Sequence, residues 1–341
     1  MDFDYLISAR RRTGDVFQPA PGPISFLKVP RSAATYDASH IIPPKTWVAE
    51  VQGLADGDQN PNSISPTGDV LIFVHGYNND IAAVLQRQRT LRTTLQAEGW
   101  KGEIAGFDWP SGNNVLNYVE DRLDAAAVAR SLVEQGITRL IQGQKAGCVT
   151  NVHLLGHSTG AYVILEAFAQ AEKNGDLFKS DWRMGQVALM AGDVAQDALQ
   201  ASSDWSKPMF RRIMRLTNYS NGYDAVLAVS NAKRLGVSPR VGRVGLPAEV
   251  NPKAINVDCS AYFQRLKPDA NAGLSWTHAW HFGNKVFARD LAMTLEGAID
   301  RHSIPTRAVM GGRLTLIDAP RPQFQQAWGI RESAQYVTPR A

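Results

Sequence analysis

Residues 149–171 read VTNVHLL, GHSTG and AYVILEAFAQA in succession, and the central turn from Gly156 to Gly160 decides the fold. The apolar run before this turn is typical of a buried strand, and the small and apolar residues after it are typical of a helix packed on a sheet. Ser158 then lies at a sharp strand-to-helix turn, and glycines two positions away on either side let the two elements approach closely. This context predicts a nucleophile elbow with Ser158 as the nucleophile. The plainer alternative is an ordinary turn at the start of a helix.

A second apolar run, VLIFV at residues 70–74, ends in His75-Gly76-Tyr77 and lies about 80 residues before the serine. A strand that ends in His-Gly supplies a backbone N–H to an oxyanion hole, because the glycine lets the backbone turn toward the nucleophile. The expected donors are the N–H of Tyr77 and the N–H of Thr159, the residue that follows the predicted nucleophile. An ordinary turn after a strand is the alternative reading.

Short apolar runs alternate with longer helical patterns from residue 70 onward. This alternation predicts an α/β fold with a mostly parallel sheet and helices on both faces. The expected strands are at residues 70–74, 103–107, 149–155, 187–190, 213–216 and 254–257. The expected helices follow residue 81, cover 117–142, begin at 159, and carry Phe287, Leu291, Leu295 and Ile299 on the apolar face of the last one.

The first 65 residues have a different composition, rich in Pro, Ser, Thr and Asp. They contain two strand-like pieces, at residues 5–8 and 24–27, and prolines beside them are typical of edge strands. We therefore expect an N-terminal extension with edge strands at 1–65, a catalytic domain at 66–305 and a C-terminal tail at 306–341.

The composition of the 341 residues, 44% hydrophobic and 20% charged, is that of a globular protein and excludes a disordered chain or a coiled coil. A formal net charge of +4 gives little support for a nucleic-acid partner. Cys148 and Cys259 are the two cysteines, and both lie in apolar runs, which excludes a disulfide framework.

The N-terminus lacks the apolar run of a secretory signal, and no stretch approaches the roughly 20 apolar residues of a membrane span. No C-x-x-C, H-E-x-x-H, P-loop or G-x-G-x-x-G motif occurs in suitable surroundings. We therefore expect a cytoplasmic protein with no metal, no cofactor, and neither a nucleic-acid nor a membrane partner.

Four segments in a fixed order resemble the α/β-hydrolase superfamily, and more closely a branch of that superfamily with unknown function. The HGYN and WPS pieces are specific to the branch, whereas GHSTG belongs to the whole superfamily. The segments are FVHGYNND (73–80), FDWPS (107–111) with Tyr118 and Asp121 downstream, LLGHSTG (154–160) and HAWHFGNKVFARDL (278–291). The resemblance implies an α/β-hydrolase fold and a triad of serine, acid and histidine in that chain order.

The resemblance places the triad histidine on a loop after the last strand, which leaves the last three of the seven histidines. His278 matches the family pattern, because Asn284 follows it at the expected offset of six residues. His281 is the alternative, and His302 follows the last helix at the surface. If neither His278 nor His281 is catalytic, both only cap the final helix.

Asp224 follows the strand at 213–216, in the loop where the superfamily usually carries the triad acid, and the resemblance implies that it orients the histidine. Asp193, one strand earlier, is the alternative, and Asp258 has a poorer position. Each of these could instead cap a helix.

The resemblance implies a serine hydrolase, an esterase that cleaves a small-molecule carboxylic ester through an acyl-enzyme. An acyltransferase or thioesterase would use the same triad. A non-catalytic binding protein with the hydrolase fold is the third possibility, because a fold alone does not determine function.

Overall fold

A computed structural model describes residues 2–55, 67–111, 118–142, 149–173, 175, 179, 182–233, 238–268 and 273–322, with backbone alone at 67, 118–124, 149 and 231–233. The end of the predicted N-terminal extension, most of the predicted C-terminal tail, Cys148 and the side chains of Tyr118 and Asp121 lie outside these residues.

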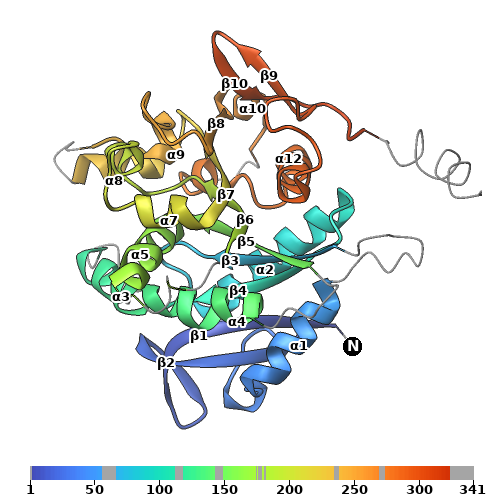
Figure 1. The fold of residues 1–341 in the computed structure, drawn as a ribbon, viewed down its shortest axis with the longest axis vertical. Coiled ribbons are helices and arrows are strands. Elements are labelled where there is room, and N and C mark those ends of the chain that lie inside the picture. Colours follow the sequence, from blue (N-terminus) through green and yellow to red (C-terminus); the bar gives the residue numbers. More distant parts are fainter. Residues whose placement is uncertain are drawn as a thin grey trace, which may run out of the picture.

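The described strands form one ten-stranded sheet in the order β2-β1-β4-β3-β5-β6-β7-β8-β10-β9 (Figure 1). Neighbouring strands are parallel from β1 to β10, and an antiparallel hairpin closes each end of the sheet. The strands are β1 (Phe3–Thr13), β2 (Val16–Pro30), β3 (Thr67–Val74), β4 (Glu103–Asp108), β5 (Val149–His157), β6 (Met184–Met190), β7 (Ile213–Ser220), β8 (Ala254–Asp258), β9 (Arg307–Met310) and β10 (Arg313–Leu316). The predicted mostly parallel sheet is confirmed.

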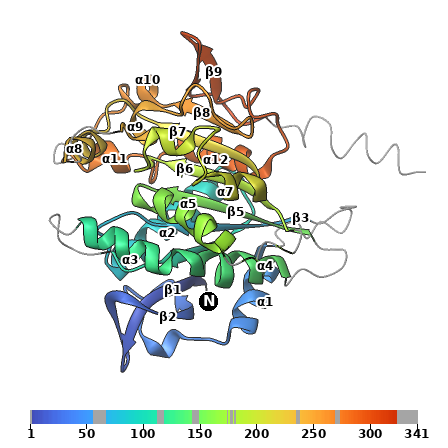
Figure 2. The ribbon, with the colours of Figure 1, turned by 60° about the vertical axis from the view of Figure 1, so that its left-hand side comes forward.

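Helices cover both faces of the sheet, as predicted: α3, α4, α5 and α7 pack on one face, and α2, α10 and α12 on the other (Figures 1 and 2). The described helices are η1 (Ala38–His40), α1 (Pro44–Ala55), α2 (Ile81–Ala97), α3 (Tyr118–Ser131), η2 (Leu132–Ile137), α4 (Thr138–Gln142), α5 (Thr159–Lys173), η3 (Gln196–Leu199), α7 (Lys207–Arg212), α8 (Ala225–Lys233), α9 (Val241–Val244), α10 (Ser260–Phe263), α11 (Trp276–Ala279) and α12 (Lys285–Glu296).

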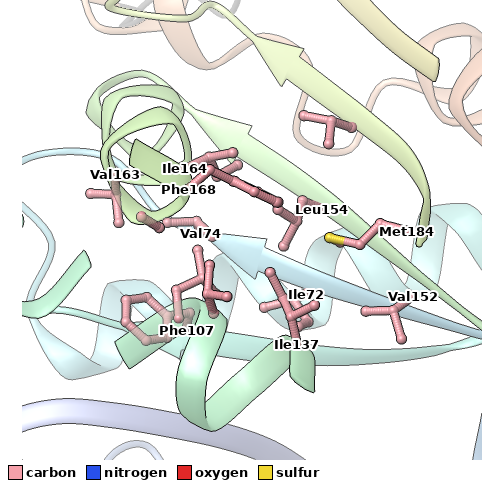
Figure 3. Close-up of a cluster of buried hydrophobic side chains, with 14 of the residues drawn as sticks. Ile72, Val74, Phe107, Ile137, Val152, Leu154, Val163, Ile164, Phe168 and Met184 are labelled. Atoms are coloured by element: carbon pink, nitrogen blue, oxygen red, sulfur yellow. The ribbon is translucent and has the colours of Figure 1, made fainter. Parts of the chain in front are cut away.

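The continuous apolar run of β3 is explained by burial on both faces. Ile72 and Val74 belong to the core under α5, where Figure 3 shows them beside Leu154 and Ile164. Leu71 and Phe73 alternate with them and belong to the core under α2 and α12. Side chains of successive strand residues point to opposite faces, so a strand covered twice must be apolar throughout.

The N-terminal residues join the same sheet as the central strands. β1 pairs in parallel with β4, where Tyr5 lies opposite Ala105 and Ser8 opposite Asp108. Leu6 and Ile7 are both fully buried, on opposite faces of the sheet. β2 forms the outer edge and carries the prolines, which is where a missing N–H donor does least damage.

The last helix is shorter than its apolar pattern suggests. α12 ends at Glu296, and Gly297 follows in a left-handed conformation with φ 66° and donates to the carbonyl of Met293. Glycine adopts this conformation without steric cost and stops the helix. The expectation that Ile299 continues the apolar face of this helix was wrong.

Candidate active site

Ser158 occupies the turn between β5 and α5 with a backbone φ of 54°, a left-handed conformation that costs a non-glycine residue energy. Three backbone hydrogen bonds hold it there. Its N–H donates to Met190, and its carbonyl accepts from Ala161 and Asp193. The side chain is nearly enclosed, with 8% of its surface exposed. These hydrogen bonds and the surrounding side chains therefore hold the predicted nucleophile in its strained conformation.

Gly160 is required by the close approach of α5 to the end of β3. A Cβ at this position would lie 2.1 Å from the carbonyl oxygen of Val74, which is much closer than atoms can approach. Thr159 is the first residue of α5, so its N–H has no carbonyl one turn earlier to bond. This N–H is a ready donor beside Ser158.

The HGYNN loop, residues 75–79, lies directly against Ser158. A Cβ added to Gly76 would lie 2.8 Å from Cβ of Ser158 and 3.1 Å from the carbonyl oxygen of His157. Within the loop, Nδ2 of Asn79 donates to the carbonyls of Gly76 at 2.8 Å and Tyr77 at 2.9 Å. The structure thus brings the HGYNN loop against Ser158, which directly precedes α5.

His278 and Asp224 form a buried pair, with Nδ1 of His278 2.7 Å from Oδ2 of Asp224. Asp224 is completely buried, and its other oxygen accepts the N–H of Leu227 at 2.9 Å. Nε2 of His278 has no hydrogen-bond partner among the described residues. A proton on Nδ1, donated to the carboxylate, leaves Nε2 able to accept a proton. This is the arrangement of a general base.

Two further hydrogen bonds join the loop of the acid to the helix of the histidine. The N–H of Ala225 donates to Oγ1 of Thr277 at 3.1 Å, and Nδ2 of Asn221 donates to the carbonyl of Thr277 at 3.4 Å. Asp224 and His278 lie more than fifty residues apart in the sequence, so these contacts are tertiary.

Neither alternative residue takes part in a pair of histidine and carboxylate within the described residues. Asp193 forms an ion pair with the buried Arg240 at 3.2 Å and accepts a hydrogen bond from Ser230. His281 is buried between aromatic rings, 4.1 Å from Trp280 between ring centroids, and no ion pair joins it to a carboxylate within the described residues. The described pairing is therefore between His278 and Asp224.

Sequence reasoning missed a role for His157, the residue before the serine. Its ring is buried, and Nε2 donates to the backbone carbonyl of His278 at 3.2 Å. The two imidazole rings lie 4.9 Å apart. Burial, together with the nearby His278, holds the pKa of His157 well below its usual value. A neutral His157 thus connects the nucleophile turn to the segment that carries His278.

His281→Phe is expected to make the protein less sensitive to acid. Burial and the neighbouring His278 hold the pKa of His281 well below its usual value, so the folded state keeps this ring neutral. In the unfolded chain, His281 binds a proton below about pH 6.5. The contribution of His281 to the stability of the folded protein is therefore complete above that pH and is lost as the pH falls. Unfolding free energy should fall by about 1.4 kcal/mol per pH unit for each such histidine.

Denaturant unfolding at pH 7.5 and pH 5.0 measures this effect. The variant should lose less unfolding free energy than the wild type between the two pH values, by up to about 2 kcal/mol, since one titrating group is removed over 1.5 pH units. His157 keeps its own contribution, so the dependence shrinks without vanishing. Equal pH dependences in the two proteins would contradict the prediction.

In the described part of the chain, no group of three or more His, Cys, Asp or Glu side chains is arranged to hold a metal ion. Among the same residues, no helix is long and apolar enough to cross a membrane.

A family model described as alpha/beta hydrolase of unknown function (DUF900) matches residues 60–254, more than half of the chain. The chain belongs to this family. The predicted membership of the α/β-hydrolase superfamily and the predicted fold are confirmed. The match includes Ser158 and Asp224 but ends before His278. The placement of His278 beside Asp224 therefore rests on the structure.

Solved structures that resemble this α/β hydrolase do so distantly. A metagenomic carboxyl esterase is 12% identical, with 71% of this chain and 80% of that chain covered and a TM-score of 0.35. A cutinase-like protein from Cryptococcus sp. is 15% identical, with 69% and 95% covered and a TM-score of 0.33. No curated protein matches the chain.

Proposed function

We propose that this α/β hydrolase is a serine hydrolase that cleaves carboxylic esters through an acyl-enzyme. The observation that carries the proposal is the buried pair of His278 and Asp224, with Nε2 of the histidine left open for a proton. The segment that carries His278 is hydrogen-bonded to the residue before Ser158. This bond links the segment of the proposed base to the turn of the proposed nucleophile, which supports a triad of Ser158, His278 and Asp224.

In the proposed reaction, Oγ of Ser158 attacks the ester carbonyl carbon while Nε2 of His278 takes the hydroxyl proton. The carbonyl electrons move to oxygen, and the N–H groups of Tyr77 and Thr159 stabilise that charge. The tetrahedral intermediate expels the alcohol, which receives the proton from His278. Water then repeats the sequence on the acyl-enzyme, and the carboxylic acid leaves.

Labelling with a fluorophosphonate tests the nucleophile without requiring the natural substrate. We expect one phosphonyl group per chain on the tryptic peptide of residues 146–173, in which Ser158 is the only serine. Ser158→Ala should abolish both this label and the hydrolysis of p-nitrophenyl esters over a panel of acyl chain lengths. A wild-type chain that is neither labelled nor active across the panel would overturn the proposal and leave a binding protein with the hydrolase fold.

The acyl acceptor is a separate question that the same protein answers. A hydrolase transfers the acyl group to water, so added alcohols or amines leave the yield of free acid unchanged. An acyltransferase would form the new ester or amide at the expense of the acid, and a thioesterase would turn over acyl thioesters faster than matched oxygen esters.

A further inference from the structure

The HGYNN loop is anchored from outside by a group of buried charged and polar side chains. Arg10, on β1, directs Nε toward both carboxylate oxygens of Asp108, at 2.9 and 2.8 Å. Both side chains are almost completely buried, at 3% and 0% exposure. Nη2 of Arg10 also donates to the carbonyl of Asn79 at 3.0 Å. One guanidinium therefore contacts the end of β4 and the end of the loop together.

Asp108 connects this arginine to the start of the loop. One of its oxygens lies 3.0 Å from Nε2 of His75, and the other accepts a hydrogen bond from the hydroxyl of Tyr36. Burial opposes ionisation of Asp108, but Arg10 and His75 outweigh burial and hold its pKa below the usual range. The carboxylate is thus a fixed negative charge that receives donors from three separate segments.

Trp109 and Ser111, which follow Asp108 in the chain, also contact the HGYNN loop. The indole of Trp109 stacks on the ring of His75, 5.4 Å between centroids and 9° between planes, and its Nε1 donates to the carbonyl of His75 at 2.8 Å. Oγ of Ser111 accepts the N–H of Asn79 at 3.1 Å. The loop is consequently held at His75 and again at Asn79, on either side of Tyr77.

We propose that Arg10, Tyr36 and Asp108 are positioning residues for the oxyanion hole, so that the N-terminal hairpin is part of the catalytic unit. This inference rests on the proposed function. The three residues act through His75 and Asn79, which fix the direction of the Tyr77 N–H toward the charge on the tetrahedral intermediate. Such a donor must be held in place before the reaction, because a shift of about 1 Å costs roughly 100-fold in rate.

The chain contains a matched control for this proposal. Arg307, Asp290 and Tyr219 form a second buried trio of the same residue types, in which Arg307 contacts both oxygens of Asp290 and the hydroxyl of Tyr219 donates to Asp290 at 2.7 Å. This trio joins β7, α12 and β9, and within the described residues none of its hydrogen bonds or ion pairs reaches the HGYNN loop. Tyr36→Phe and Tyr219→Phe therefore remove the same hydroxyl from equivalent surroundings.

The experiment compares these two variants with the wild type in thermal melts, in ester hydrolysis, and in affinity for an alkyl trifluoromethyl ketone, which adds a serine oxygen and forms a tetrahedral oxyanion. Both variants should lose thermal stability to a similar extent. Tyr36→Phe should also lower kcat about 10- to 100-fold and reduce the affinity for the ketone by the same factor, with KM unchanged. Tyr219→Phe should leave kcat, KM and the affinity for the ketone near their wild-type values.

Arg10→Lys is the second variant, to be used if Tyr36→Phe does not fold. Lysine keeps a positive charge near Asp108 but gives up the fork that also contacts the carbonyl of Asn79, so the same parallel loss of kcat and ketone affinity is expected. Wild-type kcat and ketone affinity in the Tyr36 or Arg10 variant, or an equal loss in Tyr219→Phe, would overturn the inference while the labelled wild type upholds the proposed function. An inactive, unlabelled wild type would overturn both.

Discussion

Asp224→Asn is expected to lower kcat for ester hydrolysis about 10⁴-fold with little change in KM. An amide at this position can donate to Nδ1 of His278, which moves the imidazole proton to Nε2 and removes the base that Ser158 needs. The carboxamide has nearly the volume of the carboxylate, so the loop around Asp224 should keep its structure. Steady-state kinetics and a thermal melt of the same preparation separate the loss of rate from a loss of folding.

Asp193→Asn is the control for this prediction. Asp193 faces Arg240 across a buried ion pair, so its neutralisation leaves a buried cation with a weaker partner and should lower the melting temperature. Its kcat should stay close to that of the wild type. A larger loss of kcat in the Asp193 variant than in the Asp224 variant would show that Asp193 is the triad acid. His281→Phe extends the comparison, because it should retain turnover at pH 7.5 if His278 is the base.

Gly76→Ala is expected to lower kcat about 100- to 1000-fold, the effect of losing one oxyanion donor. The new Cβ would lie 2.8 Å from Cβ of Ser158, so the HGYNN loop must move away from the nucleophile and take the N–H of Tyr77 with it. The three atoms nearest to this methyl group belong to Ser158 and His157, so the pair of His278 and Asp224 should remain in place. The measurements are kcat and the rate of labelling of Ser158 by the fluorophosphonate, which both depend on donors to a negatively charged oxygen, and KM, which shows whether substrate binding is retained.

Gly53→Ala is the matched control for the glycine. Gly53 lies on α1, and a Cβ there meets no atom within 4 Å. Alanine is the better helix former, so this variant should be unchanged in rate and equal or slightly higher in stability. Full activity in Gly76→Ala would contradict the proposed oxyanion hole, and an inactive Gly53→Ala would show that the assay responds to stability instead.

The turn around Ser158 could be predicted because its requirements are local. The apolar strand, the small-residue helix and the two flanking glycines lie within 23 consecutive residues, and their periodicities differ sharply at the turn. The two-sided burial of β3 could be predicted for a similar reason, since a run without polar residues tolerates no exposed face. In contrast, the end of α12 was misplaced, because one left-handed glycine stops a helix whose apolar pattern continues beyond it.

The choice between two aspartates and two histidines depended on distant contacts. Asp193 and Asp224 both follow strands of the same parallel sheet, so both are delivered to the same edge. The ion pair with Arg240 occupies Asp193, and the hydrogen bonds of Thr277 place His278 beside Asp224. These partners lie tens of residues away, where sequence spacing carries little information about contact.

By itself, the sequence determined the strand-to-helix turn, the serine at its centre and the α/β alternation that surrounds it, because these depend on residues that are neighbours along the chain. The tertiary structure decided which acid meets which histidine, and it joined Arg10 to Asp108 across 98 positions. The residues next to Arg10 in the chain do not indicate that it is buried. Its burial depends on the pairing of β1 with β4, which places its charge beside a carboxylate that offsets the cost of leaving water. Pairing between strands distant in the chain, and the compensation of buried charge that follows from it, are properties of the folded sheet alone.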